Sequence, residues 1–543
     1  MPNIRLDHFK RAAADVGAHG DNDMLPFDID NRFVRDNEDV LAEMAFAYSQ
    51  ELARLGHIGA KSAIESLPIF SERLLAPAGA AGFRIATKIH PFWNIYFNGL
   101  GIAVGEILEP GRSARAHSYR FATEGIDLFD RTKSWRAFRE ATIDDCSTQE
   151  DEAVDVQTDI SSFYEHISHH RLENNINDLF PDDSTVAAQI DRFLSRFASG
   201  RSFGLPVGGQ CSRILAELLL SQIDQQLTDA KVVWRRYVDD FFLIAPNQSE
   251  AYRALSVLAN SLANYGLTLN RTKTTLLTVK HYVDYVRTQL GGPTDEATKL
   301  HEIDLHFDRY SDTPESDYEE LKEIVGSLDI RALLDLELRK AQPDTFLISQ
   351  IGRTLTLNEP KKSLQLCHTL LSQKNLHAFR ASWSTIMRGI STLRANETFS
   401  IIFGQLDQLL DNIPTHSPHL LTADASCLHY LRTIRFVRTQ RRAEYVFSLY
   451  STTSSQTVKR ACIDCWRHWK DRASFTRERN RWDSLRTEEQ RMLWLAASDF
   501  GDEGEKFRLQ VGQSLPHAWR LGVERKRNNE RTFESVYTKW GSK

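Results

Sequence analysis

Two adjacent aspartates interrupt an apolar stretch of this 543-residue chain. Asp239 and Asp240 lie between Val232-Val233-Trp234 and Phe241-Phe242-Leu243-Ile244, where two short strands are expected to turn. Aspartate is uncommon in strands and is costly to bury without a counter-charge. Two acids at such a tip therefore have two interpretations, which are a solvated turn and a site for a divalent cation.

A third acid favours the interpretation of these residues as a site for a divalent cation. The segment Val154 to Ile160 alternates like a strand and places Asp159 near its end. Two hard divalent ions held by carboxylates can activate the attacking oxygen and stabilise the leaving oxygen in phosphoryl transfer. We predict that Asp159, Ile160, Asp239 and Asp240 form a site for two Mg²⁺ ions, for which Mn²⁺ can substitute, with Asp159 and Asp239 bridging them. A lone strand aspartate would be a cap or a surface residue, so the prediction depends on the combination.

Four ordered motifs between about Phe83 and Leu277 resemble those of a reverse transcriptase. They are Asp159-Ile160-Ser161-Ser162-Phe163-Tyr164, then Gly204-Leu205-Pro206-Val207-Gly208-Gly209-Gln210-Cys211-Ser212, then Tyr237-Val238-Asp239-Asp240, and last Gly266-Leu267-Thr268-Leu269-Asn270-Arg271-Thr272-Lys273. Four motifs in this order are far more specific than any one of them. The resemblance implies a polymerase with fingers and palm that uses dNTPs, makes DNA and binds nucleic acid.

The resemblance also implies roles for single residues. Tyr164 would lie under the incoming sugar and favour deoxynucleotides, and Lys273 would donate a proton to the departing pyrophosphate. Gly208, Ser212 and Tyr237 belong to the motifs that surround the nucleotide. The alternatives are a core aromatic ring for Tyr164, a surface position for Lys273 and simple helix-start signals for the glycines.

An apolar strand expected upstream carries two cations four residues apart. Arg84 and Lys88 precede Pro91, and two cations on one strand would suit a triphosphate. The alternative is ordinary exposed charge, since basic residues on strand edges also suppress aggregation.

One departure from the common reverse transcriptase motifs indicates which subgroup of these enzymes the chain resembles. Val207 occupies the position where retroviral, retron and group II intron enzymes commonly have glutamine. In this respect the chain is similar to abortive-infection and unknown-group antiphage reverse transcriptases. That subgroup implies a role in phage defence, with priming by the protein itself and a covalent protein-DNA product, templating by a partner noncoding RNA or by nothing, and assembly into homo-oligomers. The alternatives are a conventional retroelement RNA-directed DNA polymerase and a catalytically retired nucleic-acid-binding scaffold.

Composition limits the other classes. The chain has 67 Lys and Arg against 73 Asp and Glu, for a net charge of −6, so nucleic-acid binding must depend on local charge. No apolar run reaches the ~18 residues of a membrane span and the start lacks a signal-peptide core, so we expect a cytoplasmic protein without membrane contact.

The expected fold class is α+β, with polymerase fingers and an antiparallel palm sheet followed by an all-α, repeat-like domain. Residues 1–80 form a helical extension, 81–290 the fingers and palm, 291–316 a linker, and 317–543 a helical domain that replaces the thumb and ends in a basic tail. In that domain Arg432, Arg435, Arg438 and Arg442 recur at helical spacing, which predicts a basic stripe for nucleic acid. The alternative is a salt-bridged solvent face.

Overall fold

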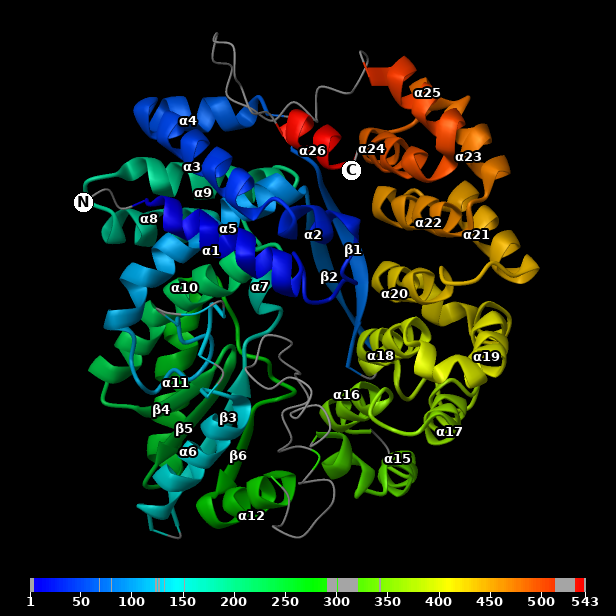
Figure 1. Cartoon of the computed structure of the whole chain (residues 1–543). Helices are drawn as coiled ribbons and strands as arrows, with labels where there is room; N and C mark the ends of the chain where they lie inside the picture. The colour runs from blue at the N-terminus through cyan, green and yellow to red at the C-terminus, as the bar shows by residue number, and fades with distance from the viewer. Residues whose placement is uncertain are drawn as a thin grey trace.

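The computed structural model describes residues 4–290, 300, 321–512 and 533–541, apart from 68, 80, 123–124, 126, 131, 151 and 341–342. Figure 1 shows a palm and fingers on one side, and on the other an arc of helices that runs from the palm back to the N-terminal helices. The predicted linker 291–316 lies outside the described residues except for Leu300, as does the predicted basic part of the tail, Arg525-Lys526-Arg527.

The N-terminal region is helical up to residue 65. Its helices are α1 (Leu6–His19), α2 (Ile29–Arg35), α3 (Glu38–Arg54) and α4 (Gly56–Glu65). The strands β1 (Ser71–Ala78) and β2 (Gly82–Ile89) then pair antiparallel, and we call them the fingers hairpin. The predicted boundary after residue 80 is therefore wrong, because it divides this hairpin. A strand must satisfy its backbone groups with a partner, so β1 belongs with β2.

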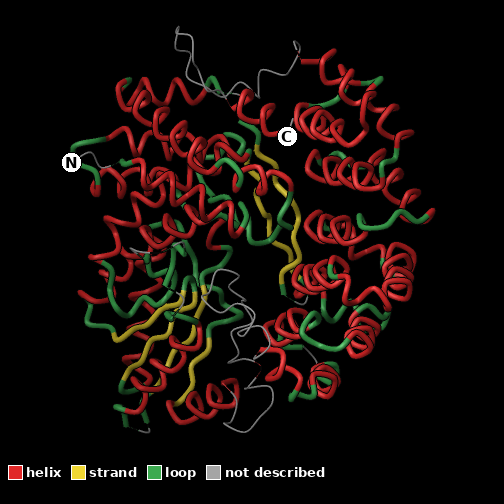
Figure 2. Tube along the Cα trace, viewed as in Figure 1, coloured by secondary structure: helices red, strands yellow, loops and turns green. Residues whose placement is uncertain are grey.

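The palm contains a four-stranded antiparallel sheet in the order β4-β5-β3-β6 (Figure 2). Its strands are β3 (Val154–Asp159), β4 (Val233–Tyr237), β5 (Asp240–Ala245) and β6 (Thr275–Thr278). Its helices are α5 (Pro91–Leu108), α6 (Trp135–Ser147), α7 (Phe163–His166), α8 (His169–Leu179), α9 (Ser184–Phe197), α10 (Gln210–Asp229), α11 (Gln248–Asn264) and α12 (Val279–Leu290).

Both faces of this sheet are covered, which explains the unbroken apolar run in β5. Phe242 and Ile244 pack in a small core with side chains of α6 and α12, whereas Phe241 and Leu243 belong to the main core with α10 and α11. Successive strand residues point to opposite faces, so a strand covered on both faces is apolar throughout. The sheet is therefore a rigid support for residues at its ends.

The C-terminal region is all-α over its described residues, 321–512 and 533–541, as predicted. Its helices are α15 (Ile330–Glu337), α16 (Thr345–Thr354), α17 (Pro360–Leu370), α18 (Trp383–Ala395), α19 (Phe403–His416), α20 (Asp424–Ile434), α21 (Gln440–Thr452), α22 (Gln456–Trp469), α23 (Arg472–Arg479), α24 (Thr487–Ala496), α25 (Gly501–Val511) and α26 (Phe533–Gly541). Short 3-10 helices are η1 (Glu109–Gly111), η2 (Arg380–Ser382), η3 (Glu397–Ile402), η4 (Pro418–Thr422), η5 (Trp482–Ser484) and η6 (Ala497–Phe500).

These helices form two layers. Helices α16, α18, α20, α22 and α24 pack on one another in sequence, while α17, α19 and α21 form a second layer on the outside of the arc (Figure 1). Stacked helix pairs of this kind make an α-solenoid. We refer to α15–α25 as the solenoid.

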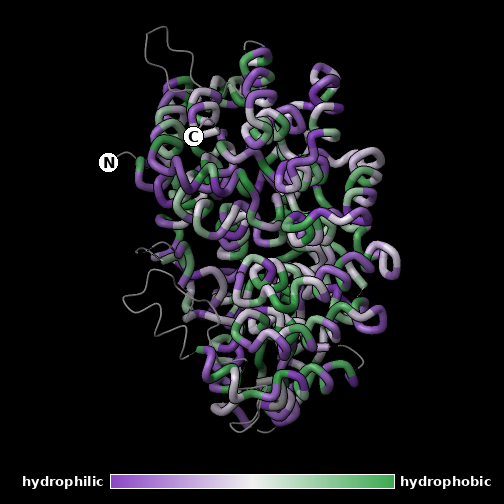
Figure 3. The backbone as a smooth tube through the Cα atoms, turned by 45° about the vertical axis from the view of Figure 1, so that its right-hand side comes forward, coloured by the Kyte–Doolittle hydropathy of each residue, from purple (hydrophilic) through white to green (hydrophobic). Residues whose placement is uncertain are grey.

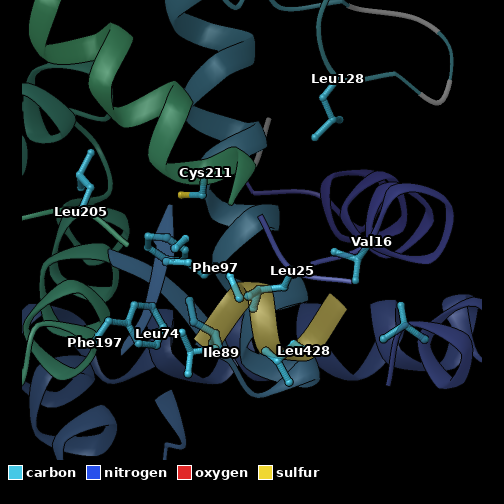
Figure 4. Close-up of a cluster of buried hydrophobic side chains, with 14 of the residues drawn as sticks. Val16, Leu25, Leu74, Ile89, Phe97, Leu128, Phe197, Leu205, Cys211 and Leu428 are labelled. Carbon is cyan, nitrogen blue, oxygen red and sulfur yellow. The ribbon is translucent and has the colours of Figure 1, made fainter. Parts of the chain in front are cut away.

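One connected hydrophobic core joins the regions. Leu25 of the N-terminal region, Leu74 of the fingers hairpin, Cys211 of α10 and Leu428 of the solenoid lie in the same buried cluster (Figure 4). Hydrophilic and hydrophobic residues alternate along the helices (Figure 3), as expected for helices with one buried face. The solenoid is thus packed onto the fingers hairpin and the palm. Among the helices that the structure describes, none combines the length and apolarity that crossing a membrane requires.

Candidate active site

Strand pairing brings the predicted acids together. In the β3–β5 pair, Asp159 lies opposite Asp240. The β4–β5 hairpin pairs Tyr237 with Asp240, so Val238 and Asp239 form its tip. Val238 has a φ of 54°, a left-handed conformation that a β-branched residue rarely adopts. This strained turn sets Asp239 beside the end of the β3–β5 pair.

The negative charges of Asp159, Asp239 and Asp240 repel one another. Burial and the neighbouring Asp240 and Asp159 raise the pKa of Asp239 to about 7. Burial and Asp159 raise the pKa of Asp240 to about 6, against a smaller opposite effect of Lys273. The site therefore holds more negative charge than its own cations neutralise.

Lys273 partly offsets that charge. Its ammonium group contacts Oδ2 of Asp159, and this contact raises the pKa of Lys273. The Lys273 side chain is 63% exposed, whereas that of Asp159 is 8% exposed. Oδ1 of Asp159 is buried and has no hydrogen-bond partner among the described residues. One oxygen of this carboxylate is therefore paired and the other is left for a ligand.

The chemistry of these groups suits a hard divalent cation. Carboxylate oxygens are the donors that Mg²⁺ and Mn²⁺ prefer. A divalent cation would partner Oδ1 of Asp159 and relieve the repulsion that raises the pKa of Asp239 and Asp240. Within the described residues, however, no three His, Cys, Asp or Glu side chains are already arranged as a metal site. The residues fit the cation by type and charge, and its binding stays a prediction.

A buried ionic network supports the hairpin tip from below. Arg236, which is fully buried, pairs with Asp224 at 2.6 Å and Glu217 at 2.9 Å. The hydroxyl of Ser118 accepts the N–H of Val238 at 2.8 Å and donates to Glu217 at 2.5 Å. Arg236 also donates to the carbonyl of Val238 at 3.2 Å. These contacts hold the strained turn in place.

Sequence reasoning missed most of this network. Through its contacts with Glu217, Asp224 and the carbonyl of Val238, Arg236 braces the strand that ends at the hairpin tip. Glu217 and Asp224 are seven residues apart in α10, hence on one face of the helix, and both are buried. Two acids on the apolar face of a helix were the available signal, because buried acids need a cation.

The acids open into a large cleft of about 1770 Å³. The fingers hairpin contributes Phe83 and Arg84 to its lining, and the solenoid contributes Lys340, Phe346 and Arg353. The solenoid thus forms a wall of the same cleft as the acidic hairpin.

Most predicted site residues line this cleft. They are Arg84, Asp159, Ile160, Tyr164, Gly208, Tyr237, Asp239, Asp240 and Lys273. The charge of Arg84 lowers the pKa of both Asp239 and Asp240, which places its guanidinium within electrostatic range of them. The structure brings these residues together, and their individual roles remain predictions.

Two predicted substrate contacts lie elsewhere. The Lys88 side chain is 2% exposed and pairs with Asp21 at 2.8 Å and Asp28 at 2.9 Å, so it is a structural cation and not a triphosphate ligand. Ser212 is 1% exposed in the first turn of α10, which packs against α5, and its hydroxyl is buried without a described partner. Both residues are covered by neighbouring elements and do not line the cleft.

The predicted basic stripe is also wrong. Helix α20 ends at Ile434 and α21 begins at Gln440, so the arginines do not share one helical face. Arg442 is buried against Asp407 at 2.9 Å and Asp411 at 2.6 Å, and Arg435 pairs with Asp464 at 2.6 Å. Burial lowers the pKa of Arg432 to about 10. Arg438 is the one exposed member of the four.

The acidic hairpin, the antiparallel sheet beneath it and the facing fingers hairpin define a nucleotide polymerase with fingers and palm. Residues 120–292 match the family described as Reverse transcriptase (RNA-dependent DNA polymerase). The chain therefore contains a reverse transcriptase domain, which makes it a nucleotidyltransferase of the RNA-directed DNA polymerase type.

Similarity to solved structures is weak. One is telomerase from Candida albicans with a fragment of telomeric RNA, at 12% identity and a TM-score of 0.30, covering 64% of this chain and 67% of that one. Another is apo telomerase from Candida tropicalis, at 12% identity and a TM-score of 0.31, covering 67% of this chain and 68% of that one. No curated protein matches the chain.

Proposed function

We propose that this chain is a defence-associated DNA polymerase that adds deoxynucleotides to a hydroxyl group by two-metal phosphoryl transfer. The observation that carries the proposal is the strand register that sets Asp159 opposite Asp240, with Asp239 at the adjacent tip. These acids would hold two Mg²⁺ ions, with Mn²⁺ as a substitute. Such ions, when bound, assist the attacking and the leaving oxygens of an in-line displacement.

The side chains around the acids have matching roles. Arg84 binds the triphosphate from the fingers side, and Tyr164 packs against the sugar and disfavours a 2′-hydroxyl. Lys273 gives a proton to the pyrophosphate, which requires its ammonium group to leave Asp159 and turn to the leaving group. Its exposure of 63% leaves room for that movement.

The role in phage defence rests on the resemblance to antiphage reverse transcriptases. Val207 in the second motif and a helical domain in the position of a thumb both support that subgroup. In this proposal the protein acts in the cytoplasm as a homo-oligomer and primes synthesis itself, so that DNA becomes covalently attached. A partner noncoding RNA serves as template, or no template is used.

The polymerase proposal is tested with the Asp239→Ala/Asp240→Ala double variant. Incorporation of labelled dNTPs in Mg²⁺ should fall by at least about 100-fold. A matched control is Asp178→Ala/Asp182→Ala, which removes two exposed acids of the palm that lie outside the cleft. The control should incorporate like the wild type. Equal incorporation by the double variant and the wild type would exclude polymerase chemistry at these acids.

The finer parts of the proposal need the product itself. Sequencing the product before and after protease digestion identifies primer and template together. A product with a free 5′ end that copies an added RNA would favour a conventional retroelement enzyme. Phage plating on cells that express the wild type or the double variant tests defence separately, and equal plating would contradict it.

A further inference from the structure

A short N-terminal segment, Asp21–Met24, is built into the active-site cleft. The side-chain amide of Asn22 donates to the carbonyls of Thr87 at 3.1 Å and Val207 at 3.0 Å. The N–H of Asp23 donates to the carbonyl of Gly208 at 3.2 Å. The segment therefore connects the fingers hairpin with the second motif of the palm.

Further contacts with the fingers hairpin, with α5 and with the solenoid hold the Asp21–Met24 segment in place. Lys88 pairs with Asp21 at 2.8 Å, and the side chain of Asn94 donates to the carbonyl of Asp21 at 3.2 Å. A ring nitrogen of His429, in α20 of the solenoid, lies 3.1 Å from the carbonyl oxygen of Met24. Since these partners come from the fingers, the palm and the solenoid, the segment is a fixed part of the cleft.

The Asp21–Met24 segment explains why residue 208 is a glycine. Its φ is 107°, and a Cβ built on it would lie 2.2 Å from Oδ1 of Asn22. Gly208 belongs to the motif that we expect to surround the nucleotide, and in the structure the group that approaches it closely is the side chain of Asn22. A protein side chain thus occupies the space beside the second motif.

The next residue presents a charge to the cleft. Asp23 and Arg213 both line it and form an ion pair, in which the Asp23 side chain is 52% exposed. Arg213 also donates to Gln210 at 2.8 Å, and its guanidinium stacks over the ring of Tyr119 at 5.0 Å. The pair is held in one geometry and still faces the open space.

Tyr119 links this pair to the acidic hairpin. Burial raises the pKa of Tyr119, with Arg213 opposing the effect and Asp23 and Asp239 among the charges that add to it. Its ring therefore lies within electrostatic range of both Asp23 and Asp239. Tyr164 lies within electrostatic range of Tyr119 and Arg213, and these residues line the same cleft as Asp23 and the acids. The base of a nucleotide whose sugar lies on Tyr164 would therefore be within reach of the Asp23–Arg213 pair.

We propose that Asp23 and Arg213 contact the base edge of the incoming deoxynucleotide and determine which base is incorporated. This inference rests on the proposed polymerase function. A carboxylate accepts from exocyclic amino groups, and a guanidinium donates to ring nitrogens and carbonyl oxygens of bases. Hydrogen bonds of this kind, with one charged partner, are stronger than neutral ones. The pair thus supplies the discrimination that a template base supplies elsewhere.

The test compares the use of the four dNTPs by the full-length protein in Mg²⁺. Each dNTP is supplied alone and then all four together, with and without an added homopolymer RNA. The variants are Asp23→Asn, which keeps the shape and removes the charge, and Arg213→Lys, which keeps the charge and removes the planar donor. The control is Asp39→Asn, since Asp39 in α3 is 83% exposed and lies outside the cleft.

We expect Asp23→Asn to change the ratio between the most and the least used dNTP by about fivefold or more, while Asp39→Asn leaves it unchanged. Unchanged ratios in both cleft variants, with incorporation intact, would overturn the inference and leave the polymerase proposal standing. So would a wild-type product whose composition follows the homopolymer. A wild type that incorporates no dNTP overturns the polymerase proposal, and the inference with it.

Discussion

At the acidic hairpin, protonation, stability and cation binding are linked. An aspartate in an unfolded chain has a pKa near 3.9, whereas in the folded chain the pKa is about 7 for Asp239 and about 6 for Asp240. Between about pH 4 and 7 the folded state therefore binds more protons than the unfolded state, so the free energy of unfolding falls as the pH rises through this window. Binding of a divalent cation, which needs the ionised acids, should strengthen over the same window.

This linkage gives a prediction for Asp240→Asn. In EDTA, urea unfolding of the wild type should show a loss of stability from pH 5 to pH 8, and the variant should lose on the order of 1 kcal/mol less, because one of the repelling charges is gone. Mg²⁺ at pH 8 should stabilise the wild type more than the variant. The exposed Asp182→Asn serves as control. Parallel pH curves for variant and wild type would contradict the raised pKa values.

Some of the site residues could be predicted from the sequence and others could not. The four motifs predicted the acids, Tyr164, Tyr237 and Lys273 in one cleft, because motif order constrains a shared site. Arg84 and Lys88 looked equivalent, since residues four apart on a strand share a face. In the structure the first part of β2 is exposed and the last part is buried under the N-terminal region. The spacing of residues along a strand does not reveal which of them are buried by neighbouring elements.

At the scale of elements, the network below the hairpin tip decides whether the tip keeps its shape. Arg236, Glu217 and Asp224 are all buried. Removing one partner of such a network leaves charge that water cannot reach. The strained turn at Val238 depends on the same contacts, through Ser118 and Arg236.

We therefore predict that Arg236→Met lowers the free energy of unfolding by about 3–5 kcal/mol. The neighbouring Arg235→Met is a matched control, because Arg235 and Asp145 form a pair whose side chains are 19% and 20% exposed. We expect it to cost about 1 kcal/mol. Urea unfolding of both variants measures the difference. If the two variants lose equal stability, the buried network does not support the hairpin as inferred.

Helix boundaries explain why the predicted basic stripe in the solenoid was wrong. The arginines from Arg432 to Arg442 have helical spacing, yet a turn separates α20 from α21. Thr439 caps α21 by accepting the N–H of Arg442 at 3.1 Å, and a threonine before a helix is a known start signal. That residue was the available sign of a break. Burial of Arg442 depends on Asp407 and Asp411 from α19, a partner that local spacing cannot reveal.

At the scale of the molecule, the solenoid fastens the fingers hairpin. Glu72 of β1 accepts the N–H groups of Gln456 and Thr457, each at 2.8 Å, at the start of α22. Asp424 of α20 accepts the N–H of Leu75 at 2.8 Å. A carboxylate at a helix N-terminus is stabilised by the helix dipole as well as by the hydrogen bonds. Because β1 pairs with β2, these contacts also hold the strand that carries Arg84.

The fastening predicts an effect of Glu72→Gln far from the acids. Loss of the charge weakens the contacts to α22 by about 1.5 kcal/mol, so amide hydrogen exchange in β1 should speed up by about tenfold. The KM for dNTPs should rise because Arg84 becomes less well positioned, while the control Glu505→Gln, at an exposed position of α25, changes neither quantity. Faster exchange with an unchanged KM would separate the fastening of the hairpin from nucleotide binding. Unchanged exchange would mean that β1 is held by its pairing with β2 and by the core alone, and that the solenoid contributes a wall to the cleft without controlling the fingers.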